Sequence, residues 1–157
     1  MNIDFEKRKS VYEVEEGSSL QPKFDEKGLI PVITVGIKDN DILMHGYMNE
    51  KAFKLSIETK KAHYWSRSRQ TIWKKGEISG LTQNIRRIKI DDDQDSVIFY
   101  VELEGLEASC HVGYKSCFYR EIDLKKMSEK PKLVFTETKK TFDPKKVYGD
   151  IPNPTKL

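Results

Sequence analysis

Two groups of residues with the chemistry of metal ligands stand near one another in the chain. The first is a carboxylate cluster that comprises Asp91, Asp92, Asp93 and Asp95. The second is the pattern C-H-x-G-x-x-x-C, which runs from Cys110 to Cys117 and holds the two cysteines of the chain. Carboxylate oxygens suit Mg²⁺, whereas thiolates favour borderline metals, of which Zn²⁺ is the usual choice. We therefore predict a metal-dependent reaction centre in this part of the chain.

Each group has an expected part in such a centre. Two cysteines are too few for a closed structural zinc site, so a third ligand must come from elsewhere and a fourth position stays open for water. Zinc lowers the pKa of a bound water to about 7, and His111, which follows Cys110, is placed to move protons. Asp91, Asp93 and Asp95 alternate, so they would share one face of an extended segment. The competing interpretation is an acidic turn and two buried cysteines that act as small hydrophobic residues.

A basic, aromatic segment precedes these groups. It includes Trp65, Ser66, Arg67, Ser68, Arg69, Trp73 and Lys75. Guanidinium groups and hydroxyls suit phosphate oxygens, and tryptophan rings could stack on a base, although the hydrophobic core is the favoured place for each tryptophan. On a strand, Arg67 and Arg69 would lie on the same side. The basic residues of this segment precede the acidic residues 91–107 in the chain. This arrangement indicates a phosphorylated ligand near a metal, and the alternative is a charged surface that only contacts solvent.

The composition is that of a globular protein. The 157 residues are enough for one domain with a real core, and 34% of them are charged, which is typical of a well-solvated surface. No run approaches the roughly 18 apolar residues that a membrane helix needs, and the first residues lack the apolar core of a signal peptide. Two cysteines do not make a disulfide scaffold. We expect a cytoplasmic protein that does not bind a membrane.

The hydrophobic pattern predicts the elements that would carry these residues. Strands are expected at 32–37, 42–47, 62–65, 84–90 and 97–101, with shorter extended stretches at 118–122 and 132–135. Pro31 is expected at the first position of the first strand, which should form a hairpin with the second. A helix should begin after Asn49, which is a good N-cap residue. The expected division is an arm at residues 1–24, a domain at 25–124 and an extension at 125–157.

In these motifs the chain resembles the phosphoribosyl-AMP cyclohydrolase family over roughly residues 24–120. The motifs that carry the resemblance are, in order, Gly28–Pro31, Tyr47–Asn49, Trp65–Arg69, Trp73–Glu77, Ser79–Gly80, Gln83, the aspartate cluster and Cys110–Phe118. The resemblance implies an α+β fold, in which a single strand-rich domain has a mixed β-sheet and few helices and forms a homodimer. It also implies a hydrolase of L-histidine biosynthesis that opens the adenine ring of phosphoribosyl-AMP at the N1–C6 bond.

The same resemblance implies a role for each residue that matches a family motif. The implied metal ligands are Asp91, Asp93 and Asp95 for Mg²⁺, and Cys110 and Cys117 for Zn²⁺. The zinc ligands would be drawn from both subunits of the homodimer. His111 would be the general acid or base. The residues that would line the nucleotide pocket are Trp65, Ser66, Arg67, Ser68, Arg69, Trp73, Lys75, Glu77 and Ser79.

The chain departs from the family pattern at Asp92, where the family has a cysteine that is the third zinc ligand. A carboxylate also binds zinc, so Asp92 would give a mixed sulfur–oxygen site that is harder and less selective than a thiolate site. His45 also stands where relatives usually carry a small or apolar residue, and it is a less favoured replacement ligand.

Three functions are open on these grounds. The first is a phosphoribosyl-AMP cyclohydrolase with an aspartate-substituted metal site. The second is a paralogue that hydrolyses another purine-like ring or amidine. The third is a catalytically silent protein that binds nucleotides or RNA, whose affinity for nucleic acid would fall with salt. Both cysteines, His111 and the alternating aspartates argue against the third, because a binding protein does not need them. Nucleic acid is therefore not the expected partner.

Overall fold

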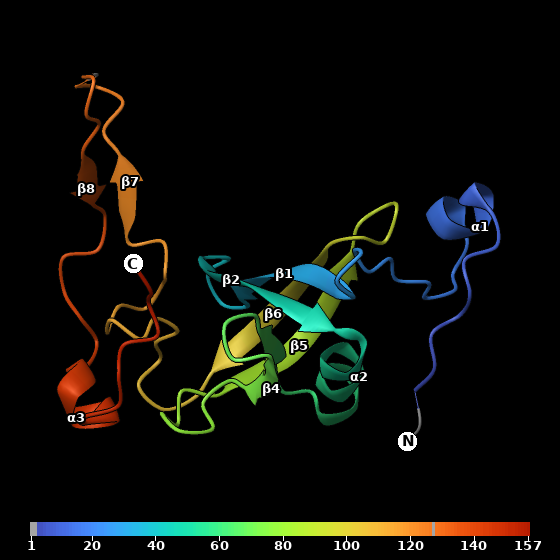
Figure 1. The fold of residues 1–157 in the computed structure, drawn as a ribbon, viewed down its shortest axis with the longest axis horizontal. Coiled ribbons are helices and arrows are strands. Elements are labelled where there is room, and N and C mark those ends of the chain that lie inside the picture. Colours follow the sequence, from blue (N-terminus) through green and yellow to red (C-terminus); the bar gives the residue numbers. More distant parts are fainter. Residues whose placement is uncertain (1–2, 127) are drawn as a thin grey trace.

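The computed structural model describes residues 3–126 and 128–157, and its centre is a four-stranded mixed sheet (Figure 1). The strands lie in the order β2 (Ile42–Asn49), β1 (Leu29–Gly36), β6 (Val97–Leu103) and β5 (Gln83–Ile90). Strand β1 runs antiparallel to β2 and parallel to β6, and β5 runs antiparallel to β6. The mixed sheet, with few helices around it in one small domain, confirms the predicted α+β fold.

The strands of this sheet follow the predicted pattern, with shifts at their ends. The hairpin of β1 and β2 is present, but the prediction that Pro31 begins its first strand is wrong, because pairing with β2 already begins at Leu29. The parallel pairing of β1 with β6 begins only at Val32. Pro31 therefore lies outside the parallel ladder, where its missing N–H group is tolerated.

Helix α2 (Glu50–Thr59) follows β2 directly and confirms the helix predicted after Asn49. The Asn49 side chain accepts a hydrogen bond from Ala52 N at 2.9 Å, which satisfies a free N–H group at the start of the helix. Helix α2 buries Ala52 and Phe53 against the core. Burial of one side of the helix holds it close to the sheet.

The separate two-stranded pair of β3 (His63–Ser66) and β4 (Thr71–Lys74) lies beside α2 and β2. The residues between these strands form a turn, in which Gln70 has a positive φ of 51°. The prediction that Arg67 and Arg69 share one side of a strand is therefore wrong. The chain has to reverse at this point so that β4 can pair with β3.

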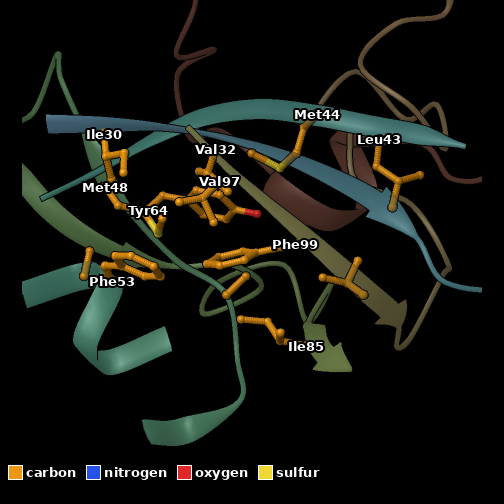
Figure 2. Packing of buried hydrophobic residues seen from close by; sticks show 13 residues of the cluster. Ile30, Val32, Leu43, Met44, Met48, Phe53, Tyr64, Ile85, Val97 and Phe99 are labelled. Carbon is orange, nitrogen blue, oxygen red and sulfur yellow. The ribbon is translucent and has the colours of Figure 1, made fainter. Parts of the chain in front are cut away.

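The hydrophobic core lies between the sheet, α2 and β3 (Figure 2). A chain of buried hydrogen bonds crosses it. The Thr34 and Tyr64 hydroxyl oxygens are 2.7 Å apart, and the Tyr64 hydroxyl donates to Gln83 Oε1 at 2.6 Å. Gln83 Nε2 then donates to Ser109 Oγ at 3.0 Å. Because Ser109 immediately precedes Cys110, the core helps to fix the position of the cysteines.

The arm predicted at residues 1–24 contains the short helix α1 (Val11–Glu16), whose N-cap residue is Ser10. The arm contacts the domain, because the rings of Phe5 and Phe53 lie 5.3 Å apart between centroids. Met1 and Asn2 of the arm, and Met127 of the extension, lie outside the described residues. The division into arm, domain and extension stays a prediction.

The extension begins within a hairpin of β7 (Arg120–Ile122) and β8 (Leu133–Phe135), whose residues are all exposed. This hairpin projects away from the sheet in Figure 1. The chain then returns to the domain, where Phe142 is buried against Leu81 and Ala108 before helix α3 (Pro144–Tyr148). Within the described residues, the helices are too short or too polar to cross a membrane.

Candidate active site

The cysteine loop runs from Cys110 to Cys117 and brings the two thiols close enough for each to change the acidity of the other. Gly113 N donates to Cys110 O at 3.0 Å, which closes the turn. Gly113 has a φ of 106°, and a Cβ atom there would lie 2.6 Å from Phe142 O, so the loop requires glycine at this position. The far end of the loop is tied to β2, because Cys117 N donates to Leu43 O at 2.7 Å.

The contact between the thiols changes their acidity in opposite directions. The hydrogen bond with Cys117 lowers the pKa of Cys110 to about 6. The same hydrogen bond raises the pKa of Cys117, whose residue is itself exposed. Cys110 is therefore the thiol of the pair that ionises more easily. Thiolate sulfur is a ligand that a borderline metal such as zinc favours, so the pair fits zinc by its chemistry.

His111 is half-buried and directly follows Cys110 in the chain. Burial lowers the pKa of its ring, although a hydrogen bond with the Asn153 side chain acts in the opposite direction, so the imidazole is neutral at pH 7. Its Nε2 atom is buried and has no hydrogen-bond partner among the described residues. Leaving a buried polar atom unpaired is costly. This nitrogen is therefore available to a polar group of a bound molecule.

A buried lysine stands behind the cysteine loop. Lys75 is 4% exposed, and its Nζ donates to Ser109 O at 2.7 Å and lies 5.2 Å from the centroid of the Trp73 ring. Burial lowers the pKa of Lys75, and the nearby Cys117 and Cys110 act in the opposite direction. The ammonium is thus placed to balance the negative charge of the thiolates. The sequence predicts contact of Lys75 with the nucleotide, and this stays a prediction.

The aspartate loop runs from Asp91 to Asp95 and gathers three carboxylates. Asp91, Asp93 and Asp95 each offer an oxygen that lies within 4.8 Å of the others. The expected extended segment is wrong, because the loop is a turn in which Gln94 has a φ of 59°. Asp91 Oδ1 accepts hydrogen bonds from Asp95 N at 2.9 Å and Ser96 N at 3.0 Å. Burial and the neighbouring carboxylates raise the pKa of Asp95, so this group of acids could hold Mg²⁺.

Gln94 is a structural residue of this loop that the sequence analysis missed. It is 5% exposed, and its side-chain oxygen accepts from Gln21 N at 2.7 Å. Its side-chain nitrogen donates to Val14 O at 3.0 Å and Ser19 O at 3.2 Å, and its backbone oxygen accepts from Lys23 N at 2.7 Å. Gln94 therefore fastens the arm to the aspartate loop. Its one sequence signal is an uncharged amide inside a run of acids.

The two groups of candidate ligands lie at opposite ends of β6. The aspartate loop precedes this strand and the cysteine loop follows it, and the 7 residues of the strand span roughly 20 Å at about 3.3 Å each. Among the residues that the structure describes, the aspartates are the one group of three or more acids, histidines or cysteines within ligand distance. Neither Asp92 nor His45 joins the cysteines within the chain.

The residues predicted to bind the nucleotide lie along β3, β4 and the segments beside them. Arg67, Ser68, Arg69 and Glu77 are exposed, whereas Trp65, Ser66, Trp73 and Ser79 are partly buried. The Arg67 guanidinium lies 4.1 Å from the centroid of the Tyr47 ring, and the Arg69 Nε donates to Ser66 Oγ at 3.2 Å. The turn between β3 and β4 therefore presents two arginines to solvent, where phosphate oxygens could reach them.

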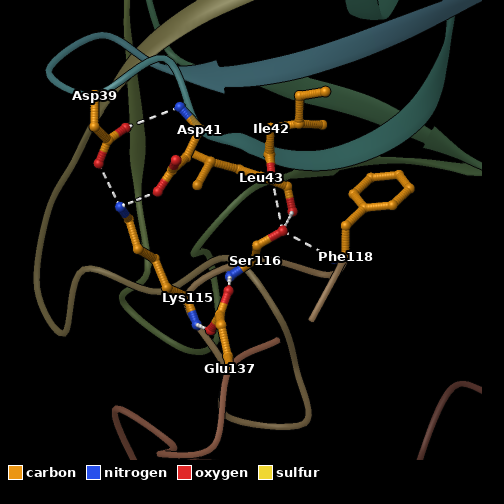
Figure 3. A network of polar contacts seen from close by, with 8 residues as sticks. All are labelled: Asp39, Asp41, Ile42, Leu43, Lys115, Ser116, Phe118 and Glu137. Atoms are coloured by element: carbon orange, nitrogen blue, oxygen red, sulfur yellow. Dashed lines mark hydrogen bonds and ion pairs between the residues drawn. The ribbon is translucent and has the colours of Figure 1, made fainter. Parts of the chain in front are cut away.

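A polar network joins the cysteine loop to the β1–β2 turn and to the extension (Figure 3). Lys115 Nζ forms ion pairs with Asp39 and with Asp41, the second at 2.8 Å. The Glu137 carboxylate accepts hydrogen bonds from Lys115 N at 3.2 Å and Ser116 N at 3.3 Å. The loop is therefore held on both sides by charged groups from distant parts of the chain.

Comparisons with known proteins agree with this arrangement. Residues 44–119, which contain both loops, match the model of the family described as Phosphoribosyl-AMP cyclohydrolase. A Phosphoribosyl-AMP cyclohydrolase of Sinorhizobium fredii is 42% identical over 142 residues, which are 90% of this chain and 92% of the relative. A relative of the same name from Rhizobium leguminosarum bv. trifolii is 45% identical over 136 residues, covering 87% of this chain and 89% of the relative.

A third relative of this name, from Rhodopseudomonas palustris, is 45% identical over 137 residues, which are 87% of this chain and 91% of the relative. The shared residues thus extend well beyond the two loops and take in most of both chains. Identity at this level over nearly the full length is far beyond what a common fold alone produces. The chain belongs to the phosphoribosyl-AMP cyclohydrolase family, and it is an enzyme, a hydrolase of histidine biosynthesis.

Proposed function

We propose that this protein opens the adenine ring of phosphoribosyl-AMP in the cytoplasm by hydrolysis of the N1–C6 bond. The observation that carries the proposal is the unpaired, buried Nε2 of His111, which follows Cys110 in a loop whose two thiols influence each other's acidity. A neutral imidazole next to a pair of potential zinc ligands is the arrangement that a metal-assisted hydrolysis needs. The names of the relatives supply the substrate.

The reaction adds one water molecule, and the residues present are suited to move its protons. The ribosyl group on N1 makes C6 of the ring electrophilic. His111 Nε2 would take a proton from the water as the new O–C6 bond forms, and would return it to N1 as the N1–C6 bond breaks. The water oxygen then becomes the carbonyl oxygen of a carboxamide at C6, and the second proton ends on the exocyclic nitrogen. Because burial lowers the pKa of His111, the ring is in its basic form at neutral pH.

Zn²⁺ and Mg²⁺ are the proposed cofactors. Cys110 and Cys117 fit zinc, since thiolates are ligands that zinc favours and the two thiols influence each other's acidity across one short loop. When bound, zinc lowers the pKa of its water and so supplies the nucleophile near neutral pH. Asp91, Asp93 and Asp95 fit magnesium, since their oxygens lie within 4.8 Å of one another.

We also propose a homodimer in which the zinc ligands come from both subunits. Within the described residues, no further acid or histidine gathers with Cys110 and Cys117. Asp92 is exposed at the far end of β6 and is not a member of the aspartate group. The partner subunit's Asp92 would be the third ligand, in the place where the family pattern has a cysteine. The nucleotide would bind near the turn that carries Arg67 and Arg69.

The first experiment follows ring opening of phosphoribosyl-AMP by absorbance and counts metals per chain by mass spectrometry. We expect turnover with about one zinc per chain. His111→Asn should keep the metal and lose turnover by about 10²–10⁴-fold, whereas Cys110→Ser should lose both. Metal without turnover of this substrate would favour a hydrolase of another purine-like ring. Neither metal nor turnover would favour a nucleotide-binding protein.

The shared zinc site is tested by mixing two inactive variants. Asp92→Ala lacks the carboxylate and Cys110→Ala lacks one thiolate, so each should be inactive alone. A mixed dimer of the two variants contains one complete site. After exchange of subunits, random pairing should therefore recover about a quarter of the wild-type activity. A mixture that stays as inactive as its components contradicts a site shared between subunits.

A further inference from the structure

The β7–β8 hairpin carries an exposed apolar face. Ile122, Leu133 and Phe135 are 57%, 51% and 53% exposed. Ile122 pairs with Leu133, and Arg120 pairs with Phe135. Paired residues and alternate residues of a strand share a face, so these four side chains lie on one side of the hairpin. The Phe135 ring contacts Tyr114 and Tyr119 of the same chain, so the free part of this face is formed by Ile122 and Leu133. Because a two-stranded hairpin with so little support is at best marginally stable in water, this part is suited to pack against another surface.

Helix α1 is a second exposed surface, with apolar and acidic side chains. Val11 and Tyr12 are 71% and 73% exposed, and Val14 is its buried residue. Its charged residues are Glu13, Glu15 and Glu16. A helix of 6 residues is too short to be stable by itself. Gln94 holds α1 in place by donating to Val14 O at 3.0 Å, so this acidic and apolar surface is fixed beside the aspartate loop.

These two surfaces flank the two halves of the proposed zinc site. The hairpin begins soon after Cys117, at Arg120. At the other end, α1 and the aspartate loop enclose a hollow of about 340 Å³ that Asp92 helps to line. In Figure 1, α1 and the hairpin stand at opposite ends of the sheet and project toward the same side of it. A second copy on that side would meet both of them.

A two-fold axis that brought the partner subunit's Asp92 to Cys110 and Cys117 would also bring α1, which lies beside the aspartate loop, toward the hairpin that follows the cysteine loop of the other copy. The charges of the two surfaces are complementary. The bases of the hairpin and its loop are Arg120, Lys125, Lys126, Lys130 and Lys132, and its acids are Glu121, Asp123 and Glu129. We propose that the β7–β8 hairpin of each subunit packs on α1 of the other subunit. This inference rests on the proposed shared zinc site and names the surfaces that hold it together.

A disulfide trap between subunits tests this contact. Tyr12→Cys and Ile122→Cys are prepared as separate full-length proteins, their subunits are exchanged, and the mixture is oxidised. We expect a covalent dimer on a denaturing gel from the mixture and little from either variant alone. The matched control replaces Ile122→Cys by Val134→Cys, which is also exposed and lies on the opposite face of the same hairpin. Equal yields from the two mixtures would overturn the proposal.

Charge reversal provides a second measurement. One variant reverses the glutamates of α1, with Glu13→Lys and Glu15→Lys. The other is Arg120→Glu, at a position on the proposed contact face of the hairpin, whereas Lys132→Glu alone is the control on the opposite face with Val134. The α1 variant and Arg120→Glu should each raise the dimer Kd by about tenfold or more, measured by sedimentation equilibrium, and a mixture of the two should form mixed dimers in preference to either homodimer. Unchanged Kd values in both variants would contradict the contact.

The outcomes separate this inference from the function on which it rests. In one outcome, the mixture of Asp92→Ala and Cys110→Ala recovers activity, while the specific disulfide does not form and charge reversal has no effect. That result supports the shared zinc site and overturns the contact between α1 and the hairpin. A chain that stays monomeric and shows no recovery overturns both. Recovery together with the specific disulfide supports both.

Discussion

At the scale of single residues, burial acts on His111 and Lys75 in the same way and leaves them with different tasks. Burial disfavours the charged form of each side chain. For His111 the result is a neutral ring that accepts a proton. For Lys75 the neighbouring Cys117 and Cys110 act against burial and favour the charged form of the amine. The same kind of environment thus acts on a candidate base and on a candidate cation.

We expect kcat/KM to fall as the pH is lowered, with the fall centred below pH 6.5. A protonated ring cannot accept a proton, and burial lowers the pKa of His111 from its ordinary value of 6.5, so the inactive form arises only at lower pH. The measurement is a pH profile of kcat/KM with the zinc content followed in the same samples. That control is needed because protonation of Cys110 also releases metal. A fall centred above 6.5 at constant zinc content would contradict this role of His111.

Lys75→Met should weaken zinc binding by about tenfold while the chain stays folded. Lys75 lowers the pKa of Cys110, so its removal raises that pKa, and the metal must then displace a more tightly held proton. Competition with a chelator measures the affinity. Lys74→Met is the matched control, because Lys74 is the neighbouring residue on β4 and is more exposed than Lys75. Equal affinities in the two variants would show that the buried charge has no part in holding the metal.

At the scale of elements, the loops at the two ends of β6 are shaped by contacts with distant segments. The turn of the aspartate loop needs Gln94 in the left-handed region, and the arm occupies the hydrogen-bonding groups of the Gln94 side chain. The cysteine loop needs glycine at position 113 and is closed by the extension. The strands set the distance between the two loops. The arm and the extension stabilise the conformation of each loop through hydrogen bonds.

Gln94→Ala should lower the free energy of unfolding by about 2–4 kcal/mol, because three hydrogen bonds of a buried amide are lost together. Magnesium affinity should fall as well, since the aspartate loop loses its anchor. Unfolding in urea and magnesium titration measure the two effects. Gln70→Ala is the control, because Gln70 also has a positive φ but is exposed, and its change should stay within about 0.5 kcal/mol. Equal losses in the two variants would argue against the anchor.

The strands of the sheet and the helix after Asn49 could be predicted because their signals are local. Alternating or continuous apolar residues mark β5 and β6, and an N-cap residue marks the start of α2. The turn at residues 67–70 was missed because alternating serine and arginine imitate a strand. The aspartates do gather, but a turn brings them together and not an extended face. The partners of the Gln94 side chain could not be predicted, since they lie 73 to 80 residues away in the chain.

At the scale of the whole molecule, both ends of the chain return to the loops that carry the candidate metal ligands. The arm reaches the aspartate loop through Gln94. The extension reaches the cysteine loop, where Thr141 N and Thr141 Oγ1 donate to Gly113 O at 2.8 Å and 3.0 Å. The sequence indicates only a polar arm and a surface tail at these places. Their contacts make both segments supports of the site.

Phe142→Ala should destabilise the chain by about 3 kcal/mol, because it removes a buried ring from its contact with Leu81 and Ala108. Zinc affinity should also fall, since the backbone of Phe142 lies against Gly113 of the cysteine loop. Thermal unfolding and chelator competition measure the two effects. Ile151→Ala is the control within the same extension, because Ile151 is 52% exposed. A loss of stability without any change in zinc affinity would confine Phe142 to a structural role.

The distance along β6 also bears on how the proposed enzyme behaves in a cell. Its 7 residues keep the carboxylate and the thiolates of one chain apart. A single subunit therefore carries one incomplete part of each of the two proposed zinc sites. In the proposed homodimer, a newly synthesised chain is inactive until it associates with a second chain. Until then it binds zinc weakly and competes poorly with other zinc-binding proteins. Specific activity would then depend on enzyme concentration, and dilution below the dimer Kd would switch catalysis off without unfolding any chain.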